Sequence, residues 1–219
     1  MSVGGVGALS GAGQVRYGRA DGRRVLIATV LGSGMAFLDA TVVNIALPHI
    51  GSWEWGGSYL DSLGLGMTAV AEDLEPPELF AWFRAKREAI GIRIEPLDEH
   101  AGTVLLQTLK DGGVIGLLCD RDIQGNGIEV EFFGEQVRLP AGPATLALRT
   151  GATLVAAACY SGPGRDHFAV VTPPIAAERQ GRLRADVTRI TQLLAVELEG
   201  LIRRAPEQWH VLQPRFEGT

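Results

Sequence analysis

The sequence predicts an α/β protein in which a mixed central sheet is flanked by helices. From Gly51 onward, short apolar runs of strand length alternate with stretches of helical periodicity. One of these runs, Gly113–Cys119, is continuously apolar, which is typical of a strand buried on both faces. The composition, 46% hydrophobic and 21% charged residues in a chain of 219, is that of a globular protein able to bury a substantial core.

The N-terminal part of the chain differs from the rest in composition. Residues 1–24 are rich in glycine, alanine and serine and carry four arginines, which favours a flexible lead. Residues 25–50 then form an apolar run that is interrupted by Asp39 and Asn44 and is long enough to cross a bilayer. If residues 42–48 form a strand instead, the 17 residues Val25–Thr41 remain, which is short for a membrane span. We therefore expect an apolar anchor helix that lies on or partly in the membrane surface.

The elements after Gly51 follow from local signals. A helix is expected over Pro76–Ile90, because prolines stand near its start and Gly91 follows its end. Leu183–Arg204 is expected to be a long helix, because its apolar residues recur at a period close to 3.6. Two shorter helices are expected over Gly102–Lys110 and from Ala144 to Arg149. The expected strands are Met67–Ala71, Ile92–Pro96, Gly113–Cys119, Thr153–Tyr160 and His167–Val171.

Two polar residues follow apolar runs in a way that suggests a site. His49 follows the apolar residues 42–48, and Asp120 follows the strand expected over Gly113–Cys119. Ligands of open α/β sheets bind beyond the carboxyl ends of strands, so a shared crevice is expected. An imidazole oriented by an anion can deprotonate a hydroxyl. Glu54, five positions after His49, is a second candidate anion. From the residues alone, a solvated His49, a helix-capping Glu54 and an Asp120 paired with Arg121 remain open.

Other classes of function lose their usual support. The net charge of −5 gives no global reason to expect a nucleic-acid partner. No phosphate-binding loop and no dinucleotide-binding glycine pattern is present. The two cysteines, Cys119 and Cys159, lie in apolar runs without the spacing of a zinc site, so we expect buried, reduced thiols and no metal.

Four stretches carry a resemblance to a known family. Leu47–Glu54 contains a histidine, four residues and then an acid, and Cys119–Asp122 contains an acid-Arg-Asp element. The third stretch consists of Phe132–Gly134, Leu139–Ala144 and Arg149–Ala152, and the fourth, Ala205–His210, contains Pro-Glu-Gln-Trp. Over about residues 45–216 the chain resembles the bacterial lysophospholipid and lipid A acyltransferase family, and within it the phosphatidylinositol mannoside acyltransferases. It departs from the family at Ser52, where asparagine is usual, and at Asp120, where the mannoside enzymes tend to carry glutamate.

A second, shorter resemblance covers residues 25–48. Leu38–Pro48 is similar to the end of the first transmembrane helix of drug:proton antiporters of the major facilitator superfamily. Transporters of that kind need many spans, and no further apolar span follows here, so transport is not expected. The family of acyltransferases has a longer segment before its histidine, so the acyltransferase-like domain, residues 49–216, is expected to be truncated on its N-terminal side.

The acyltransferase resemblance implies a glycerolipid-acyltransferase-like fold and a membrane-associated O-acyltransferase at the cytoplasmic face of the cell membrane. It implies acyl-CoA as a substrate, no cofactor, and a glycolipid acceptor similar to phosphatidylinositol mannoside. In this scheme His49 is the general base, Asp120 orients it, and Glu54 maintains the geometry of the motif. Arg87 and Arg149 are candidates for phosphate contacts in substrate binding. A catalytically incomplete fusion remnant and an acyl-CoA thioesterase are the alternatives.

Overall fold

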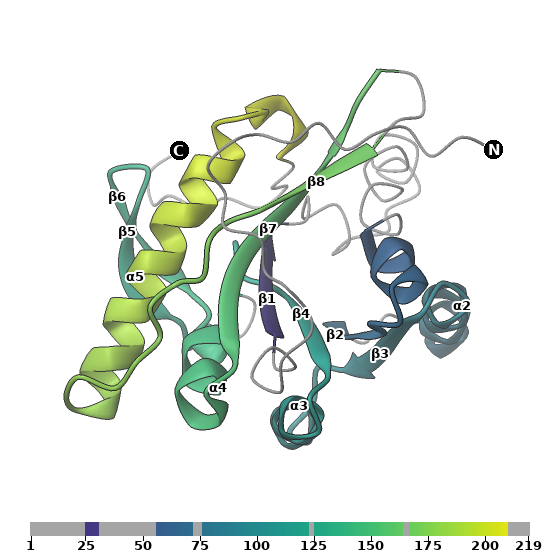
Figure 1. The fold of residues 1–219 in the computed structure, drawn as a ribbon, viewed down its shortest axis with the longest axis horizontal. Coiled ribbons are helices and arrows are strands. Elements are labelled where there is room, and N and C mark those ends of the chain that lie inside the picture. Colours follow the sequence, from purple (N-terminus) through teal and green to yellow (C-terminus); the bar gives the residue numbers. More distant parts are fainter. Residues whose placement is uncertain (1–24, 31–55, 72–75, 123–124, 164–166, 210–219) are drawn as a thin grey trace.

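A six-stranded mixed sheet forms the centre of the protein. The computed structural model describes residues 25–30, 56–71, 76–122, 125–163 and 167–209. Within these residues the strand order is β3-β2-β4-β1-β7-β8, with β1 to β4 and β7 parallel and β8 antiparallel to β7 (Figure 1). The strands are β1 (Val25–Val30), β2 (Met67–Ala71), β3 (Ile92–Pro96), β4 (Val114–Leu118), β7 (Thr153–Ser161) and β8 (His167–Val171). The predicted mixed sheet flanked by helices is confirmed.

The helices lie close to the predicted positions. They are α2 (Pro77–Glu88), α3 (Ala101–Lys110), α4 (Gly142–Thr150) and α5 (Leu183–Ile202), residues 56–62 are also helical, and a 3₁₀ turn, η2, spans Pro206–Gln208. Proline stands in the first turn of α2 and of α4, where its missing N–H costs no hydrogen bond. Gly151, with φ of +66°, ends α4 in the left-handed conformation that glycine adopts without steric strain.

The structure corrects the prediction for the start of the apolar run. Residues Val25–Val30 form β1, between β4 and β7, with Leu26 in register with Ile115 on one side and Leu154 on the other. For these six residues the expected anchor helix is wrong. The backbone of a central parallel strand is paired on both sides, and such a strand has the same continuous apolar composition as a membrane segment. The rest of Val25–Thr41 lies outside the described residues. Within the described part of the chain, every helix is too short or too polar to span a membrane.

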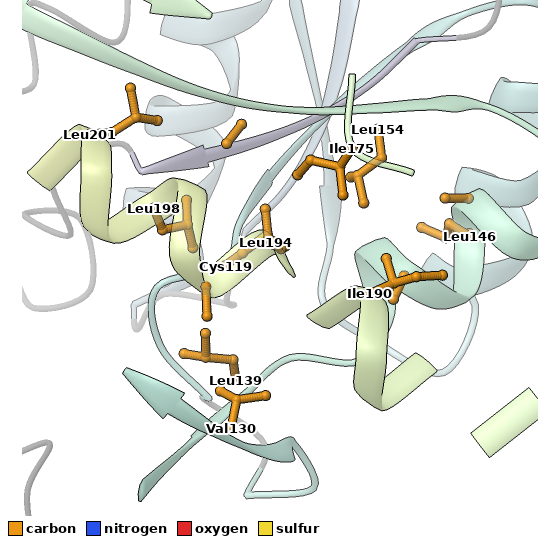
Figure 2. Close-up of a cluster of buried hydrophobic side chains, with 14 of the residues drawn as sticks. Cys119, Val130, Leu139, Leu146, Leu154, Ile175, Ile190, Leu194, Leu198 and Leu201 are labelled. Carbon is orange, nitrogen blue, oxygen red and sulfur yellow. The ribbon is translucent and has the colours of Figure 1, made fainter. Parts of the chain in front are cut away.

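The larger core lies between the sheet and the helices α3, α4 and α5. Figure 2 shows side chains of α5, of the sheet and of a β-hairpin meeting in this core. The hairpin consists of β5 (Ile128–Phe132) and β6 (Glu135–Leu139). Ile190, Leu194 and Leu198 on α5 are at most 1% exposed. Their spacing of four residues places them on one face of the helix, as the sequence periodicity predicted.

A second core cluster involves the helix over residues 56–62 and α2. It contains Met67, Ile92 and Val155 from the sheet, with Leu60 and Phe80 packed against it. Helix and strand approach closely at Gly57, where an added Cβ would lie 2.1 Å from the Cδ1 atom of Ile92. Because such a contact is far inside van der Waals distance, a larger residue at position 57 would force the Ile92 side chain to shift.

The β5–β6 hairpin was not among the predicted elements. It is attached to α5 by a pair of hydrogen bonds between Glu131 and Gln192. The Glu131 N–H donates to Gln192 Oε1 at 2.8 Å, and Gln192 Nε2 donates to Glu131 O at 2.8 Å. The signal that could have revealed it is the alternation Ile-Glu-Val-Glu-Phe over residues 128–132.

Candidate active site

A large cavity opens at the carboxyl ends of the parallel strands. Its volume is about 680 Å³, within the size range of small-molecule sites. Strand ends contribute Val70, Ala71, Leu117 and Leu118, and the first turns of α3 and α4 close the sides. This cavity lies beyond the strand ends, where the sequence predicts a site.

The lining combines an apolar body with charged groups. The apolar side chains are Val70, Phe83, Leu97, Leu105, Leu106, Leu117, Leu118 and Leu146, and the charged ones are Asp98, Glu99, Asp120, Arg121, Asp122 and Arg149. Asp98 Oδ1 accepts hydrogen bonds from the N–H groups of His100 (2.8 Å) and Ala101 (3.0 Å) at the start of α3. Because these amides already have an acceptor, an anionic ligand at this helix end would have to displace Asp98. The cavity therefore suits an apolar chain with a polar end.

Asp120 is the buried charged group of this lining. It lies two residues after the end of β4 and is only 1% exposed. Its Oδ2 accepts a hydrogen bond of 3.0 Å from the indole Nε1 of Trp209, 89 residues further along the chain. A buried carboxylate needs such donors, because burial without them would disfavour its charge. The C-terminal turn thus supplies one partner of the carboxylate predicted to orient the base.

The neighbouring Asp122 shapes the loop after β4. Its Oδ2 accepts a hydrogen bond of 2.7 Å from the N–H of Gly127. A Cβ at position 127 would lie 2.6 Å from Leu139 O and 2.7 Å from Asp122 Oδ2. Glycine is therefore required here, and Asp122 has a structural role that is separate from that of Asp120.

The predicted substrate-binding arginines lie in different environments. Arg149, in the last turn of α4, is exposed and lines the cavity. Arg87 is 1% exposed near the end of α2, with its guanidinium carbon 3.5 Å from the ring centroid of Phe83, and it is absent from the lining. Phe83 does line the cavity, so Arg87 lies behind one of its walls. Phosphate contacts by either arginine stay predictions.

The other predicted site residues, His49 and Glu54, lie outside the described residues. Their roles as base and motif acid stay predictions. Within the described part of the chain, no group of three or more His, Cys, Asp or Glu side chains is arranged to hold a metal ion.

Comparison with known proteins connects this geometry to a family. The family model for bacterial lipid A biosynthesis acyltransferases matches residues 39–217. The chain belongs to this acyltransferase family. A phosphatidylinositol mannoside acyltransferase of Mycobacterium tuberculosis (strain CDC 1551 / Oshkosh) is 36% identical over 191 residues, which are 84% of this chain and 58% of the relative. One from Mycolicibacterium smegmatis is 38% identical over 176 residues, 78% of this chain and 56% of the relative. The chain thus spans less than two thirds of the length of these relatives.

The region matched by the family model does not include the first strand of the sheet. The acyltransferase model begins at residue 39, whereas β1 ends at Val30. A central strand of the sheet is therefore built from residues outside the matched region. The resemblance of residues 25–48 to a transporter segment stays a prediction.

Sequence reasoning recognised the Pro-Glu-Gln-Trp stretch of the acyltransferase family but gave its tryptophan no role at the site. Trp209 follows η2 directly, and the preceding Gln208 is hydrogen-bonded to Ser161 at the end of β7, which holds this turn beside the sheet. A tryptophan next to polar residues after the last helix was the available signal, since a buried indole N–H usually has a hydrogen-bond acceptor.

Proposed function

We propose that this protein is a membrane-associated O-acyltransferase that moves a fatty acyl group from acyl-CoA to a hydroxyl of a glycolipid similar to phosphatidylinositol mannoside. The observation that carries the proposal is an apolar cavity that contains a buried carboxylate, Asp120, at the carboxyl ends of the strands. Membership of the acyltransferase family and the names of the mycobacterial relatives support the reaction type and the acceptor class.

The chemistry assigned to the site is general-base catalysis. His49 accepts the proton of the acceptor hydroxyl while the oxygen attacks the thioester carbonyl. The tetrahedral intermediate then collapses, the C–S bond breaks, and the coenzyme A thiolate leaves and takes up the proton. General-base catalysis of this kind contributes about 10²–10⁴-fold. Asp120 hydrogen-bonds the other ring nitrogen, selects the tautomer and stabilises the imidazolium, and Glu54 maintains the geometry of the motif.

The cavity would hold the acyl chain. Each methylene transferred from water into an apolar environment contributes about 0.8 kcal/mol, so a chain along Leu105, Leu106 and Leu146 would bind mainly through its apolar surface. Arg149 is exposed at the same cavity and would attract the coenzyme A phosphates. Arg87 would contribute only if a phosphate reached behind Phe83.

The substrates place the reaction at a surface. A glycolipid acceptor is embedded in a bilayer, whereas acyl-CoA is soluble and cytoplasmic. An enzyme that joins them has to work where the two meet, so we place the protein at the cytoplasmic face of the cell membrane.

Purified protein with labelled acyl-CoA, assayed with and without phosphatidylinositol mannoside in vesicles, tests the proposal. Acceptor-dependent transfer that His49→Ala abolishes and His100→Ala retains is the expected result; His100 is an exposed histidine outside the cavity lining. Acyl-CoA hydrolysis that is indifferent to the acceptor would identify a thioesterase. Absence of both transfer and hydrolysis would identify an incomplete remnant.

A further inference from the structure

We propose that Trp209, supported by Phe133, is a positioning residue that holds the Asp120 carboxylate in the orientation used at the site. The inference rests on the proposed function to the extent that Asp120 is taken to orient the base. Its starting point is the 3.0 Å hydrogen bond from Trp209 Nε1 to Asp120 Oδ2. A donor that holds one carboxylate oxygen also sets the direction of the other.

The backbone of Phe133 is the unusual feature that supports this role. Phe133 and Gly134 form the two-residue turn of the β5–β6 hairpin, with φ of +54° and +84°. Turns with both φ values positive favour Asn-Gly or Asp-Gly, because a bulky side chain is strained there. Among the non-glycine residues that the structure describes, Phe133 alone has a positive φ. Strain of this kind persists where surrounding contacts impose it, and it marks functional sites.

The contacts of Phe133 show what the strained turn achieves. Its ring stacks on the indole of Trp209, with centroids 5.9 Å apart and an interplanar angle of 29°. Its N–H donates to Glu199 Oε1 at 2.8 Å. Arg203, the residue directly after α5, binds Glu199 of that helix at 2.6 Å and places its guanidinium carbon 4.8 Å from the Phe133 ring centroid. The turn is thus held by α5, and its ring supports the indole.

The chain on either side of the indole is held as well. The preceding residue, Gln208, hydrogen-bonds both main-chain polar groups of Ser161 at the end of β7. Phe132 meets the Trp209 indole edge-on, with centroids 6.0 Å apart. The indole is therefore fixed by a strand end and by two rings, and its N–H is directed at the Asp120 carboxylate.

A purely structural turn would not need this arrangement. Asn-Gly would form the same turn without strain, and an apolar side chain in place of Trp209 would fill the same space without a donor. The proposal therefore predicts that a change at Phe133 lowers activity without lowering stability. Phe133→Asn should relieve the turn strain while it removes support from the indole.

The experiment combines ¹H–¹⁵N spectra of the indole groups with kinetics on the full chain. The chain has four tryptophans, and Trp209→Phe assigns the Trp209 signal by its disappearance. Asp120→Asn and Phe133→Asn should each shift that signal, and Phe133→Tyr, which keeps the ring, should leave it near its wild-type position. An unshifted signal in Asp120→Asn, or in Phe133→Asn, overturns the proposal.

In the transfer assay, Phe133→Asn and Trp209→Phe should lower kcat by about tenfold to a hundredfold, as misplacement of a reacting group does, with KM for acyl-CoA little changed. The Tm of Phe133→Asn should equal or exceed that of the wild type. In the Asp120→Asn background, the additional change Trp209→Phe should not lower kcat any further. Trp82→Phe, at an exposed tryptophan, is the control and should match the wild type. Wild-type kcat in Phe133→Asn or Trp209→Phe, or full additivity with Asp120→Asn, overturns the inference.

If the wild type transfers no acyl group, the proposed function fails, and the indole signal alone decides whether Phe133 and Trp209 position Asp120. If Phe133→Asn does not fold, Trp209→Phe and its combination with Asp120→Asn decide the question.

Discussion

Gln208 holds both main-chain polar groups of Ser161, the last residue of β7. The Ser161 N–H donates to Gln208 Oε1 at 2.8 Å, and Gln208 Nε2 donates to Ser161 O at 3.2 Å. The side-chain amide thus pairs with the end of the strand as a neighbouring backbone would, and it attaches the C-terminal turn to the sheet.

Gln208→Ala should lower the free energy of unfolding by about 1–3 kcal/mol, the sum of two net hydrogen bonds of typical strength. Urea denaturation measures this change. Glu207→Ala, at the exposed neighbouring position, is the control and should leave stability nearly unchanged. A Gln208→Ala variant as stable as the wild type would show that the pairing with Ser161 contributes nothing.

Leu194→Ala should destabilise the protein by about 2–5 kcal/mol, because Leu194 is 1% exposed in the core and its truncation leaves a cavity. Val196→Ala, on the exposed side of the same helix, should change stability by less than about 0.5 kcal/mol. Thermal and urea unfolding of the two variants provide the comparison. Equal losses would contradict the assignment of the buried face of α5.

Asp186 should make stability depend on acid pH. The N–H of Gly181 lowers the pKa of its carboxyl below the ordinary 3.8, and Gln180 N–H and Arg189 act in the same direction against desolvation. A depressed folded-state pKa adds stability that is present above pH 3.8 and is lost as the pH falls through the folded-state value. Asp186→Asn should therefore be less stable than the wild type at pH 7, with a difference that shrinks below pH 3.8. A difference that stays constant from pH 7 to pH 2.5 would rule out this linkage.

The two cysteines should be unreactive in the folded protein. Burial raises the pKa of the Cys159 thiol to about 11, and Cys119 is 1% exposed with its Sγ 3.1 Å from Leu117 O. Because the thiolate is the nucleophile, a disulfide reagent at pH 8 should label neither thiol until urea unfolds the chain, and then both. Rapid labelling of one thiol in the native state would contradict the burial. Neither cysteine is in a disulfide; Cys119 is buried as expected, whereas Cys159 is only partly buried.

Leu106→Trp should alter the preference for acyl chain length if the cavity holds the acyl chain. Leu106 lines the cavity from α3, and a larger side chain there would displace methylenes of the substrate. Each displaced methylene should reduce the binding of long-chain acyl-CoA by about fourfold, equivalent to about 0.8 kcal/mol, and should affect short chains little. Leu193→Trp, at an exposed position of α5, is the control for added bulk. Equal effects on long and short chains would place the acyl chain elsewhere.

Several elements were predictable from local sequence. Met67–Ala71, Ile92–Pro96 and His167–Val171 form the strands β2, β3 and β8 with the predicted bounds. Glycine precedes β2 and β3, a proline ends β3, and a polar residue follows β2 and β8, so the information is local. The helix over Leu183–Ile202 was likewise predictable, because an apolar face that continues over five turns is typical of an amphipathic helix.

Two elements required non-local information. Val25–Val30 has the composition of a membrane segment and of a central strand alike, and only its pairing with β4 and β7 decides between them. The hairpin turn Phe133-Gly134 lacks the Asn-Gly or Asp-Gly pair by which such turns are recognised in a sequence. Its geometry is imposed by the contacts of Phe133 with Trp209 and α5.

At the site, the sequence by itself determined that an acid follows a buried strand and that ligands belong beyond its end, since strand direction and apolar pattern are properties of short segments. It also carried the motifs of the acyltransferase family. Only the tertiary structure decided that Asp120 is buried at a cavity and receives the Trp209 N–H, and that Arg87 lies behind a cavity wall whereas Arg149 faces it. The physical reason is that a hydrogen bond across 89 residues depends on how sheet, hairpin and C-terminal turn pack together, and no local pattern encodes that packing.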